Sequence, residues 1–524
     1  MKPISVDEPG AVGVVQDRPD WMLPPEVWTG GKNFRFKEGV ARRVGGYASA
    51  LGTPTGTPSA IFNIPYTDNQ TFWFVFTLAK AYVWESGVES NVTNISADYT
   101  ATAAWQWNST VLAGIPIFNN GKDKPQWWST VSTSTKLTNL TNWPATKLAR
   151  VIRAFGSYLV AINITESGTN RPHKVLISHK ADPGAVPSSW DITDATKDAT
   201  EFELTDAKGG ELLDGMPLGS EFIFYKKNST HSMRFIGGQE LWGRDLLFEG
   251  SGILCTRCVC TADKGRRHFV VTQDDIVLHG GSKESLESVV EGKNRTAIFA
   301  EIDSLNYVYS FVFEDEKEKE LYFCYPTSGS TYPNKAFVYN YGSKTQGFRD
   351  WSGSSAARGV IQTTDTGTWA SDSDLWDADT GQWADAGREG ILFTDPTALK
   401  VYRLNDGYAF DTTTPVAYLE RTGIPAPPRT KGDRADWTSR KLCARIWPKI
   451  SGTALWTIQV GAHENRGDAV VWSTARIFNP STDTFLDIDD PANGRLLAVR
   501  FEMQDNVAAA LEGFDMEVSI LGRL

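Results

Sequence analysis

Several features are scarce in this 524-residue sequence, and each scarcity excludes a class of protein. Cysteine occurs five times, an odd and low number that argues against a disulfide framework. No run of about 18 apolar residues occurs, so we expect no membrane-spanning helix. The opening residues, MKPISVDEPG, lack the charged and apolar regions of a secretory signal, and none is predicted.

Positive charge is also in short supply. The chain has 52 lysines and arginines against 63 aspartates and glutamates, a net charge of −11. Non-specific binding to DNA depends on cations that neutralise phosphates, so we do not expect this chain to coat DNA. An acidic surface can still surround DNA without adhering to it.

The sequence motifs of common enzymes are missing as well. There is no G-x-S-x-G elbow, no phosphate-binding loop and no H-E-x-x-H helix. We therefore predict no catalytic, cofactor-binding or metal-binding residue and no cofactor, and we do not expect an enzyme.

Aromatic residues, in contrast, are abundant: 19 Trp, 16 Tyr and 26 Phe are enough to build large cores. Short apolar strands recur every roughly 8–12 residues, and hairpins recur at roughly 40-residue intervals, which is typical of β-propeller blades. The clearest hairpins join residues 72–76 to 81–84, 158–162 to 174–178, and 221–225 to 232–236. Several strands are apolar on both faces, as stacked blades require.

The fold is therefore predicted to be all-β. About six propeller-like blades fit between residues 55 and 420. Prolines make residues 424–429 extended, and strands resume after them, which indicates a C-terminal β-sandwich. We divide the chain into an N-terminal extended arm (1–54), a β-propeller-like domain (55–423) and the sandwich (430–524). A pair of stacked sandwiches is the alternative fold.

The stretch HFVVTQDDIVLHGG, residues 268–281, combines two histidines with an Asp-Asp pair. Its apolar runs and polar centre predict a hairpin with Asp274 and Asp275 in the turn. His268 and His279 would then face each other across the open end. A metal site needs three or four converging ligands, and no third is near in the sequence. We favour a scaffold hairpin over a metal or acid/base site.

The cysteine cluster at Cys255, Cys258 and Cys260 resembles half of a zinc site. Structural zinc needs a second ligand pair, and Cys324 and Cys443 are single and distant. Buried free cysteines often act as small hydrophobic residues, which is the interpretation we favour.

The segment TWASDSDLWDADTGQW carries Trp369, Trp376 and Trp383 at seven-residue intervals. The intervening Ser, Asp and Gly are poor helix formers, so successive tight turns are expected rather than a coiled coil. Residues 365–369 and 379–383 resemble the Asp-box of sialidase propellers but are each one residue short. A cation site or a sugar-stacking platform is the functional alternative to this structural role.

Acidic residues raise one further question. The charged run EDEKEKE at residues 314–320 is most simply a solvated loop tip. A glycosidase needs two carboxylates that flank a cleft, and the sequence leaves that possibility open.

Three parts of the chain resemble the podophage tail nozzle, or tail tubular protein B-like, family of short-tailed phages. These parts are GKNFRFKEGVARRVGG (31–46), the Trp/Asp repeat followed by ILFTDP (391–396) and VYRL (401–404), and GRLLAVRFE (494–502) followed by LEGFDMEV (511–518). The family includes tail proteins described as stabilising packaged DNA. None of the matching motifs is catalytic.

The resemblance implies a structural virion protein in the phage tail. Copies of the chain would form a ring, hexameric in the family, that closes the DNA channel and retains packaged DNA until ejection. Tail adaptor or connector proteins and tail fibres or spikes would be its partners, and DNA would be enclosed without sequence-specific binding. A net negative channel face would let DNA slide. The alternatives are a propeller glycosidase that cleaves surface polysaccharide and a carbohydrate-binding adhesin that uses exposed Trp.

Overall fold

The computed structural model describes residues 2–67, 70–85, 87–102, 105–238, 240–361, 388–426 and 436–522. Within these residues the protein is all-β, as expected. The helices described are α1 (Arg295–Glu301) and two 3-10 turns, η1 (Asp20–Met22) and η2 (Tyr307–Tyr309). The Trp/Asp repeat with Trp369, Trp376 and Trp383 lies outside the described residues.

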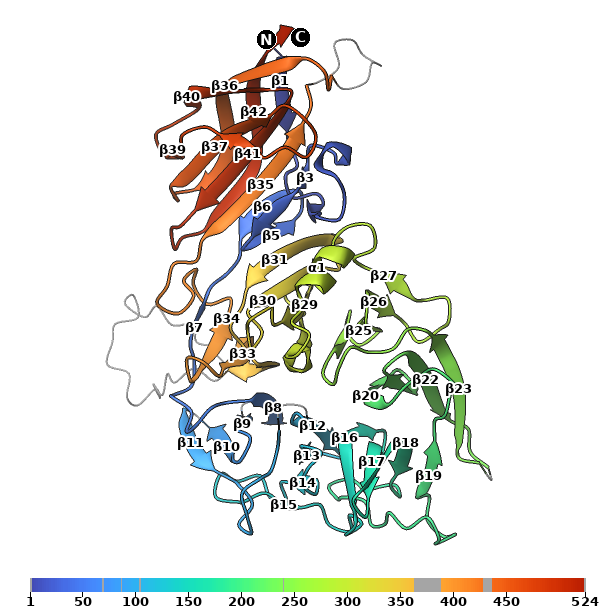
Figure 1. Ribbon diagram of the computed structural model, residues 1–524. Coiled ribbons are helices and arrows are strands. Elements are labelled where there is room, and N and C mark those ends of the chain that lie inside the picture. Colours follow the sequence, from blue (N-terminus) through green and yellow to red (C-terminus); the bar gives the residue numbers. More distant parts are fainter. Residues whose placement is uncertain are drawn as a thin grey trace, which may run out of the picture.

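Four-stranded antiparallel sheets of the propeller-blade type make up most of the molecule (Figure 1). Six are separate sheets, and a seventh set of four strands lies within a six-stranded sheet. The first blade has strands β8 (Ala60–Thr67), β9 (Gln70–Phe76), β10 (Ala81–Glu85) and β11 (Val88–Asn91), and the second has β12 (Asn108–Leu112), β13 (Ile115–Asn119), β14 (Gln126–Trp127) and β15 (Thr138–Asn139). The third blade has β16 (Lys147–Phe155), β17 (Tyr158–Glu166), β18 (Thr169–Ile177) and β19 (Thr200–Glu203), the fourth has β20 (Leu212–Leu218), β21 (Glu221–Lys226), β22 (Ser229–Phe235) and β23 (Trp242–Glu249), and the fifth has β24 (Val259–Ala262), β25 (Arg267–Val271), β26 (Ile276–His279) and β27 (Glu287–Ser288). The sixth blade has β28 (Phe311–Asp315), β29 (Glu320–Tyr325), β30 (Lys335–Asn340) and β31 (Thr345–Asp350), and the seventh has β32 (Ser355–Ile361), β33 (Arg388–Asp395), β34 (Lys400–Leu404) and β7 (Tyr47–Ser49).

Apolar side chains pack each blade against the next. The strand at residues 72–76 is buried along its whole length, as expected for a blade covered on both faces. Phe74 of the first blade packs against Phe118 of the second, with ring centroids 4.7 Å apart. Trp73 of the first blade also shares a core with Leu392 of the last, so the ring of blades closes.

The last blade is completed by the N-terminal strand β7, which pairs with β34. The described residues therefore form seven blade sheets rather than the expected six or so. The sequence pattern was insufficient for two reasons. Strands β14 and β15 span two residues each, too few for a period-2 signal, and β7 lies far from β34 in the chain.

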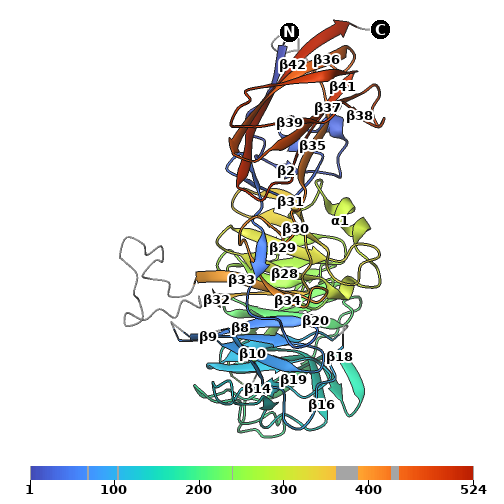
Figure 2. The ribbon, with the colours of Figure 1, turned by 90° about the vertical axis from the view of Figure 1, so that its left-hand side faces the viewer.

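A β-sandwich lies beside the sixth blade, and both chain ends lie at its far end (Figures 1 and 2). One sheet has the order β40-β36-β42-β6-β5 with β1 also on β42, and the other has β38-β37-β41-β35-β4 with β39 also on β37. The strand bounds are β1 (Lys2–Val6), β4 (Gly30–Lys32), β5 (Phe34–Lys37), β6 (Val40–Arg43), β35 (Ala417–Ile424), β36 (Arg440–Gly452), β37 (Trp456–His463), β38 (Val471–Trp472), β39 (Arg476–Phe478), β40 (Leu486–Gly494), β41 (Leu496–Met503) and β42 (Ala509–Gly522). Trp456, Phe501 and Phe514 form its aromatic centre.

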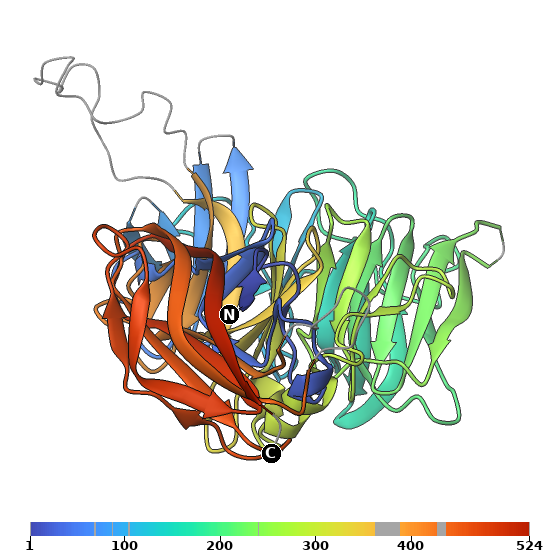
Figure 3. The same cartoon turned by 90° about the horizontal axis from the view of Figure 1, so that it is seen from above.

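The expected domain boundaries differ from the observed ones at both ends of the propeller. Residues 1–54 were expected as an extended arm but instead add strands to both domains. In addition to the sandwich strands and β7, β2 (Gly13–Val14) and β3 (Val27–Trp28) extend the sixth blade beyond β31. Strand β35, placed in the propeller by the 55–423 boundary, pairs with β41 of the sandwich. Seen from above, the sandwich overlies one side of the ring (Figure 3).

Candidate functional site

The segments that carry the family resemblance meet where the sandwich adjoins the propeller. Residues 31–46 contain the β5–β6 hairpin, and Arg42 and Ala41 pair with Ala510 and Leu511 of β42. The C-terminal segments are β41 and the centre of β42. The middle segments are β33 and β34, and β34 pairs with β7, which follows the hairpin in the chain. Segments from both ends of the chain are therefore neighbours at this junction, and the N-terminal segment continues into the blade that carries the middle segments.

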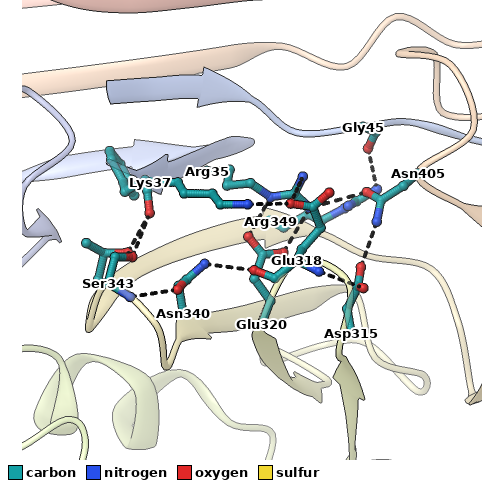
Figure 4. A network of polar contacts seen from close by, with 12 residues as sticks. Arg35, Lys37, Gly45, Asp315, Glu318, Glu320, Asn340, Ser343, Arg349 and Asn405 are labelled. Atoms are coloured by element: carbon teal, nitrogen blue, oxygen red, sulfur yellow. Dashed lines mark hydrogen bonds and ion pairs between the residues drawn. The ribbon is translucent and has the colours of Figure 1, made fainter. Parts of the chain in front are cut away.

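Buried ion pairs join the hairpin to the sixth blade at this junction (Figure 4). Arg35 of β5 donates from Nη2 to Oε2 of Glu320 over 2.9 Å, and these side chains are only 12% and 3% exposed. Glu318 Oε2 lies 3.4 Å from both Arg35 Nη1 and Lys37 Nζ. Burial alone would lower the pKa of Arg35, but the Glu320 and Glu318 carboxylates raise it above its ordinary value. The two domains are thus coupled by charges that water barely screens.

The acidic run at residues 314–320 is consequently not a solvated loop tip throughout. Its central Lys317 and Lys319 are exposed, but Asp315 and Glu320 are buried. Asp315 accepts a 2.8 Å hydrogen bond from Asn405, and Glu320 binds Arg35. The partner of Glu320 lies 285 residues away in the sequence, so no local pattern could have identified it.

A second polar contact reinforces the junction. Asn33, fully buried and in the left-handed region with φ 63°, exchanges hydrogen bonds with Asp350 at the end of β31. Its side-chain amide also donates a 2.8 Å hydrogen bond to the Val416 carbonyl just before β35. Arg349 donates a 2.7 Å hydrogen bond to the Gly45 carbonyl. Hydrogen bonds therefore fix the chain both before and after the β5–β6 hairpin.

The centre of the propeller is filled by charged side chains. The first strands of successive blades line the centre, and Asp214 on β20 is fully buried there. Arg153 of β16 donates to Asp214 Oδ1 over 2.9 Å, and the backbone N–H of Arg257 donates to Oδ2 over 2.9 Å. The Asp214 carboxylate is thus held from two neighbouring blades.

Arg257 extends from the fifth blade to the far side of the ring. Its guanidinium donates to Gln106 Oε1 and to the Ser354 carbonyl, each over 2.7 Å, and lies over the Phe311 ring. Burial lowers the pKa of Arg257 to about 10. Its φ of 76° is uncommon for a residue with a side chain, a cost that surrounding contacts must offset. These contacts bridge the second, sixth and seventh blades and close the axis.

A cavity of about 370 Å³ lies next to these contacts. Gln106 and Ser354 belong to its lining, together with the aromatic rings of Tyr82, Tyr309 and Tyr332. This volume is within the range of small-molecule sites. Among the residues described around it, none is a carboxylate. The cavity can bind a neutral ligand by stacking and hydrogen bonding, but it does not supply the carboxylate pair of a glycosidase.

Carboxylates do line a second cavity of about 350 Å³. Glu316 and Glu389 there both form ion pairs with Arg358, and Asp315 accepts from Asn405. These carboxylates are therefore held by neighbouring donors.

The hairpin at residues 268–281 is confirmed, with His268 opposite His279 in the ladder of β25 and β26. Both histidines are buried, and the Tyr225 hydroxyl lies between them, 2.7 Å from His268 Nδ1 and 2.7 Å from His279 Nε2. His268 Nε2 lies 3.0 Å from the Pro217 carbonyl. Burial lowers the pKa of His268 to about 4 and of His279 to about 3. Two neutral histidines sharing a tyrosine hydroxyl form part of the scaffold.

The cysteines also have structural surroundings. Cys255 and Cys258 are buried with their sulfurs 3.3 Å apart, and Cys260 lies on β24 and is half-buried. Burial raises the pKa of the Cys258 thiol well above its ordinary range. Within the described part of the chain, no group of three or more His, Cys, Asp or Glu side chains could hold a metal ion. No described helix is long and apolar enough to cross a membrane.

No protein-family model matches the chain, and no curated protein matches its sequence. Similar solved structures include Hsv2 from Kluyveromyces lactis, which is 8% identical with a TM-score of 0.36 over 71% of this chain and 94% of Hsv2. Another is PorZ, a surface component of the type-IX secretion system of Porphyromonas gingivalis, which is 8% identical with a TM-score of 0.33. That match covers 83% of this chain and 46% of PorZ. Likenesses this distant carry no conclusion about function.

Proposed function

We propose that this chain is a structural subunit of the tail nozzle of a short-tailed phage. The observation that carries the proposal is the convergence of the family-like segments at the junction of propeller and sandwich. Residues 31–46 pair with β42, which carries residues 511–518, and residues 402–404 pair with β7, which directly follows the N-terminal segment in the chain. A role of these segments in coupling the two domains suits a structural part of an assembly.

The filled axis indicates where DNA would pass. Asp214 binds Arg153 and the Arg257 N–H at the centre of the propeller, which argues against passage of a nucleic acid through a single copy. DNA would instead run through the lumen of a ring of copies, hexameric as in the nozzle family. The net charge of −11 favours a lumen that repels phosphate and lets DNA slide. In this proposal, tail adaptor proteins bind one end of the ring, and fibres or spikes attach around it.

A particle assay tests the retaining role. Phage particles assembled without this chain should package DNA and then lose it, so that DNA-free heads accumulate in a density gradient. Complementation with the intact chain should restore filled particles. Filled, stable particles in the absence of the chain would count against a role in DNA retention.

The tyrosine-lined cavity favours one second candidate, a carbohydrate-binding adhesin. Tyr82, Tyr309 and Tyr332 supply rings for stacking on sugars, and Tyr309 and Tyr332 already contact each other with centroids 5.1 Å apart. A glycan array with the purified chain should then show binding that Tyr309→Ala abolishes. Binding that is equal in Tyr309→Ala, or absent in both proteins, would remove this candidate.

A further inference from the structure

A cleft of about 580 Å³ lies between the propeller and the sandwich, bordered by the β5–β6 hairpin. Its charged lining is strongly basic for a chain with a net charge of −11. The charged residues that line it are Arg35, Lys37, Arg42, Arg43, Lys317 and Glu318. Five cations thus face one carboxylate within the lining.

Nearby carboxylates offset only part of this charge. Glu318 and Glu320 bind Arg35, and Glu38 lies 3.7 Å from Arg42 in a largely exposed pair. Arg43 and Lys317 have no ion-pair partner among the residues described. The cleft therefore retains a surplus of positive charge.

Arg43 is the decisive residue because it is both buried and incompletely satisfied. It is 4% exposed, and its Nη2 donates to the Pro415 and Tyr408 carbonyls over 3.2 and 3.4 Å. Its Nε and Nη1 find no hydrogen-bond partner in the described part of the chain. Asp505 acts on Arg43 from a distance but forms no ion pair with it. Burying charged donors without hydrogen-bond partners costs free energy, so we expect an acceptor beside Arg43 Nε and Nη1.

The pairing of β5 with β6 also indicates that an anion would be favourable at the cleft. Arg35 and Arg42 are direct partners across the β5–β6 ladder. Like charges opposite each other in a sheet are destabilising unless compensated. The Glu318 and Glu320 carboxylates compensate Arg35, and Glu318 also lies 3.4 Å from Lys37, but neither of these carboxylates pairs with Arg43 or Lys317.

We propose that this junction cleft is a binding site for a phosphate group, with Arg43 as the buried ligand and Arg42 and Lys317 at the rim. Arginine favours tetrahedral oxyanions because its planar array of N–H donors matches several oxygen acceptors. The phosphate can come from two sources, free inorganic phosphate or a phosphodiester of nucleic acid. This proposal does not depend on the nozzle assignment.

Isothermal titration of the full chain with inorganic phosphate and, separately, with a short oligothymidine tests the site at constant ionic strength. Arg43→Met should abolish binding, and the double variant Arg42→Ala/Lys317→Ala should weaken it about tenfold. The double variant changes exposed side chains, so it keeps the test valid if Arg43→Met does not fold. Lys208→Ala, exposed and outside the cleft lining, is the matched control and should bind like the parent.

Phosphate binding that the oligothymidine displaces would support the site with a phosphodiester as its source. Phosphate binding that the oligothymidine leaves unchanged would support free phosphate. If neither probe binds, or if the cleft variants bind as tightly as Lys208→Ala, the proposal is overturned.

Discussion

At the scale of single residues, buried polar side chains carry most of the specificity. Tyr225, His268 and His279 form a hydrogen-bonded series between the fourth and fifth blades. The series is fully satisfied with both histidines neutral: His268 donates to the Pro217 carbonyl, Tyr225 donates to His268, and His279 donates to Tyr225. The Gly281 N–H donates to His279 Nδ1 over 3.3 Å and completes it. Protonation of either imidazole would turn an accepting ring nitrogen into a donor and disrupt this series of hydrogen bonds.

This arrangement predicts that stability falls with acidification. The unfolded histidines bind protons near their ordinary pKa of 6.5, whereas the folded pKa values are about 4 and about 3. Their contribution to stability is therefore complete above pH 6.5 and is lost as pH falls toward 4. We expect a loss of about 1–2 kcal/mol per histidine between pH 7.5 and pH 5. Urea denaturation at both pH values measures it.

The double variant His268→Gln/His279→Gln is the matched control for that prediction. Glutamine keeps hydrogen-bonding groups but does not titrate, so the variant should show a flatter pH dependence. An equal loss of stability in the parent and the variant would contradict the assignment of the effect to these histidines.

The residue scale also shows where sequence reasoning succeeds and fails. The hairpin around Asp274 and Asp275 was predictable because strand and turn signals are local. The pairing of Arg35 with Glu320 was not, because it joins residues 285 apart. Likewise, Arg257 has an ordinary sequence context, and only the ring of blades brings Gln106 and Ser354 within its reach.

At the scale of elements, two N-terminal segments hold the molecule together. Strand β7 completes the last blade, and Tyr47 at its start lies 5.1, 4.8 and 4.6 Å from the rings of Phe393, Tyr402 and Phe410. The β5–β6 hairpin joins the sandwich to the sixth blade through Arg35 and Glu320. Each segment should therefore be more important for stability than its length suggests.

For β7, we predict that Tyr47→Ala lowers the free energy of unfolding by about 3–5 kcal/mol, because it removes a buried ring from an aromatic cluster. Urea denaturation followed by tryptophan fluorescence measures the change. Tyr66→Ala is the control, since Tyr66 is 54% exposed, and it should change stability by no more than about 0.5 kcal/mol. Equal effects of the two substitutions would show that β7 does not close the ring.

For the hairpin, we predict that Arg35→Met destabilises the protein by about 3–5 kcal/mol, because it leaves the Glu320 carboxylate buried without its cation. Calorimetry should show the propeller and the sandwich unfolding in more widely separated transitions. Arg234→Met breaks the exposed pair with Asp245, whose side chains are 53% and 55% exposed, and should cost about 1 kcal/mol or less.

A further variant separates charge from packing at the same site. Arg35→Met/Glu320→Gln removes the uncompensated carboxylate and should recover part of the stability that Arg35→Met loses. If the double variant is as unstable as the sum of two single losses, the ion pair is not what couples the domains.

At the scale of the whole molecule, the all-β class and the blade-like sheets followed from strand spacing and aromatic content. The number of blades and the domain boundaries did not, because β7 and β35 join partners that are distant in the chain. A ring of blades joined to a sandwich through the Arg35–Glu320 pair is well suited to an assembly subunit. The nozzle proposal extends this arrangement to a ring of copies around DNA.

Immunogold labelling of intact phage particles, with an antibody raised against this chain, tests the nozzle proposal most directly. The account predicts label confined to the tip of the short tail. Unlabelled particles, with the protein found only in the soluble fraction of the lysate, would contradict it.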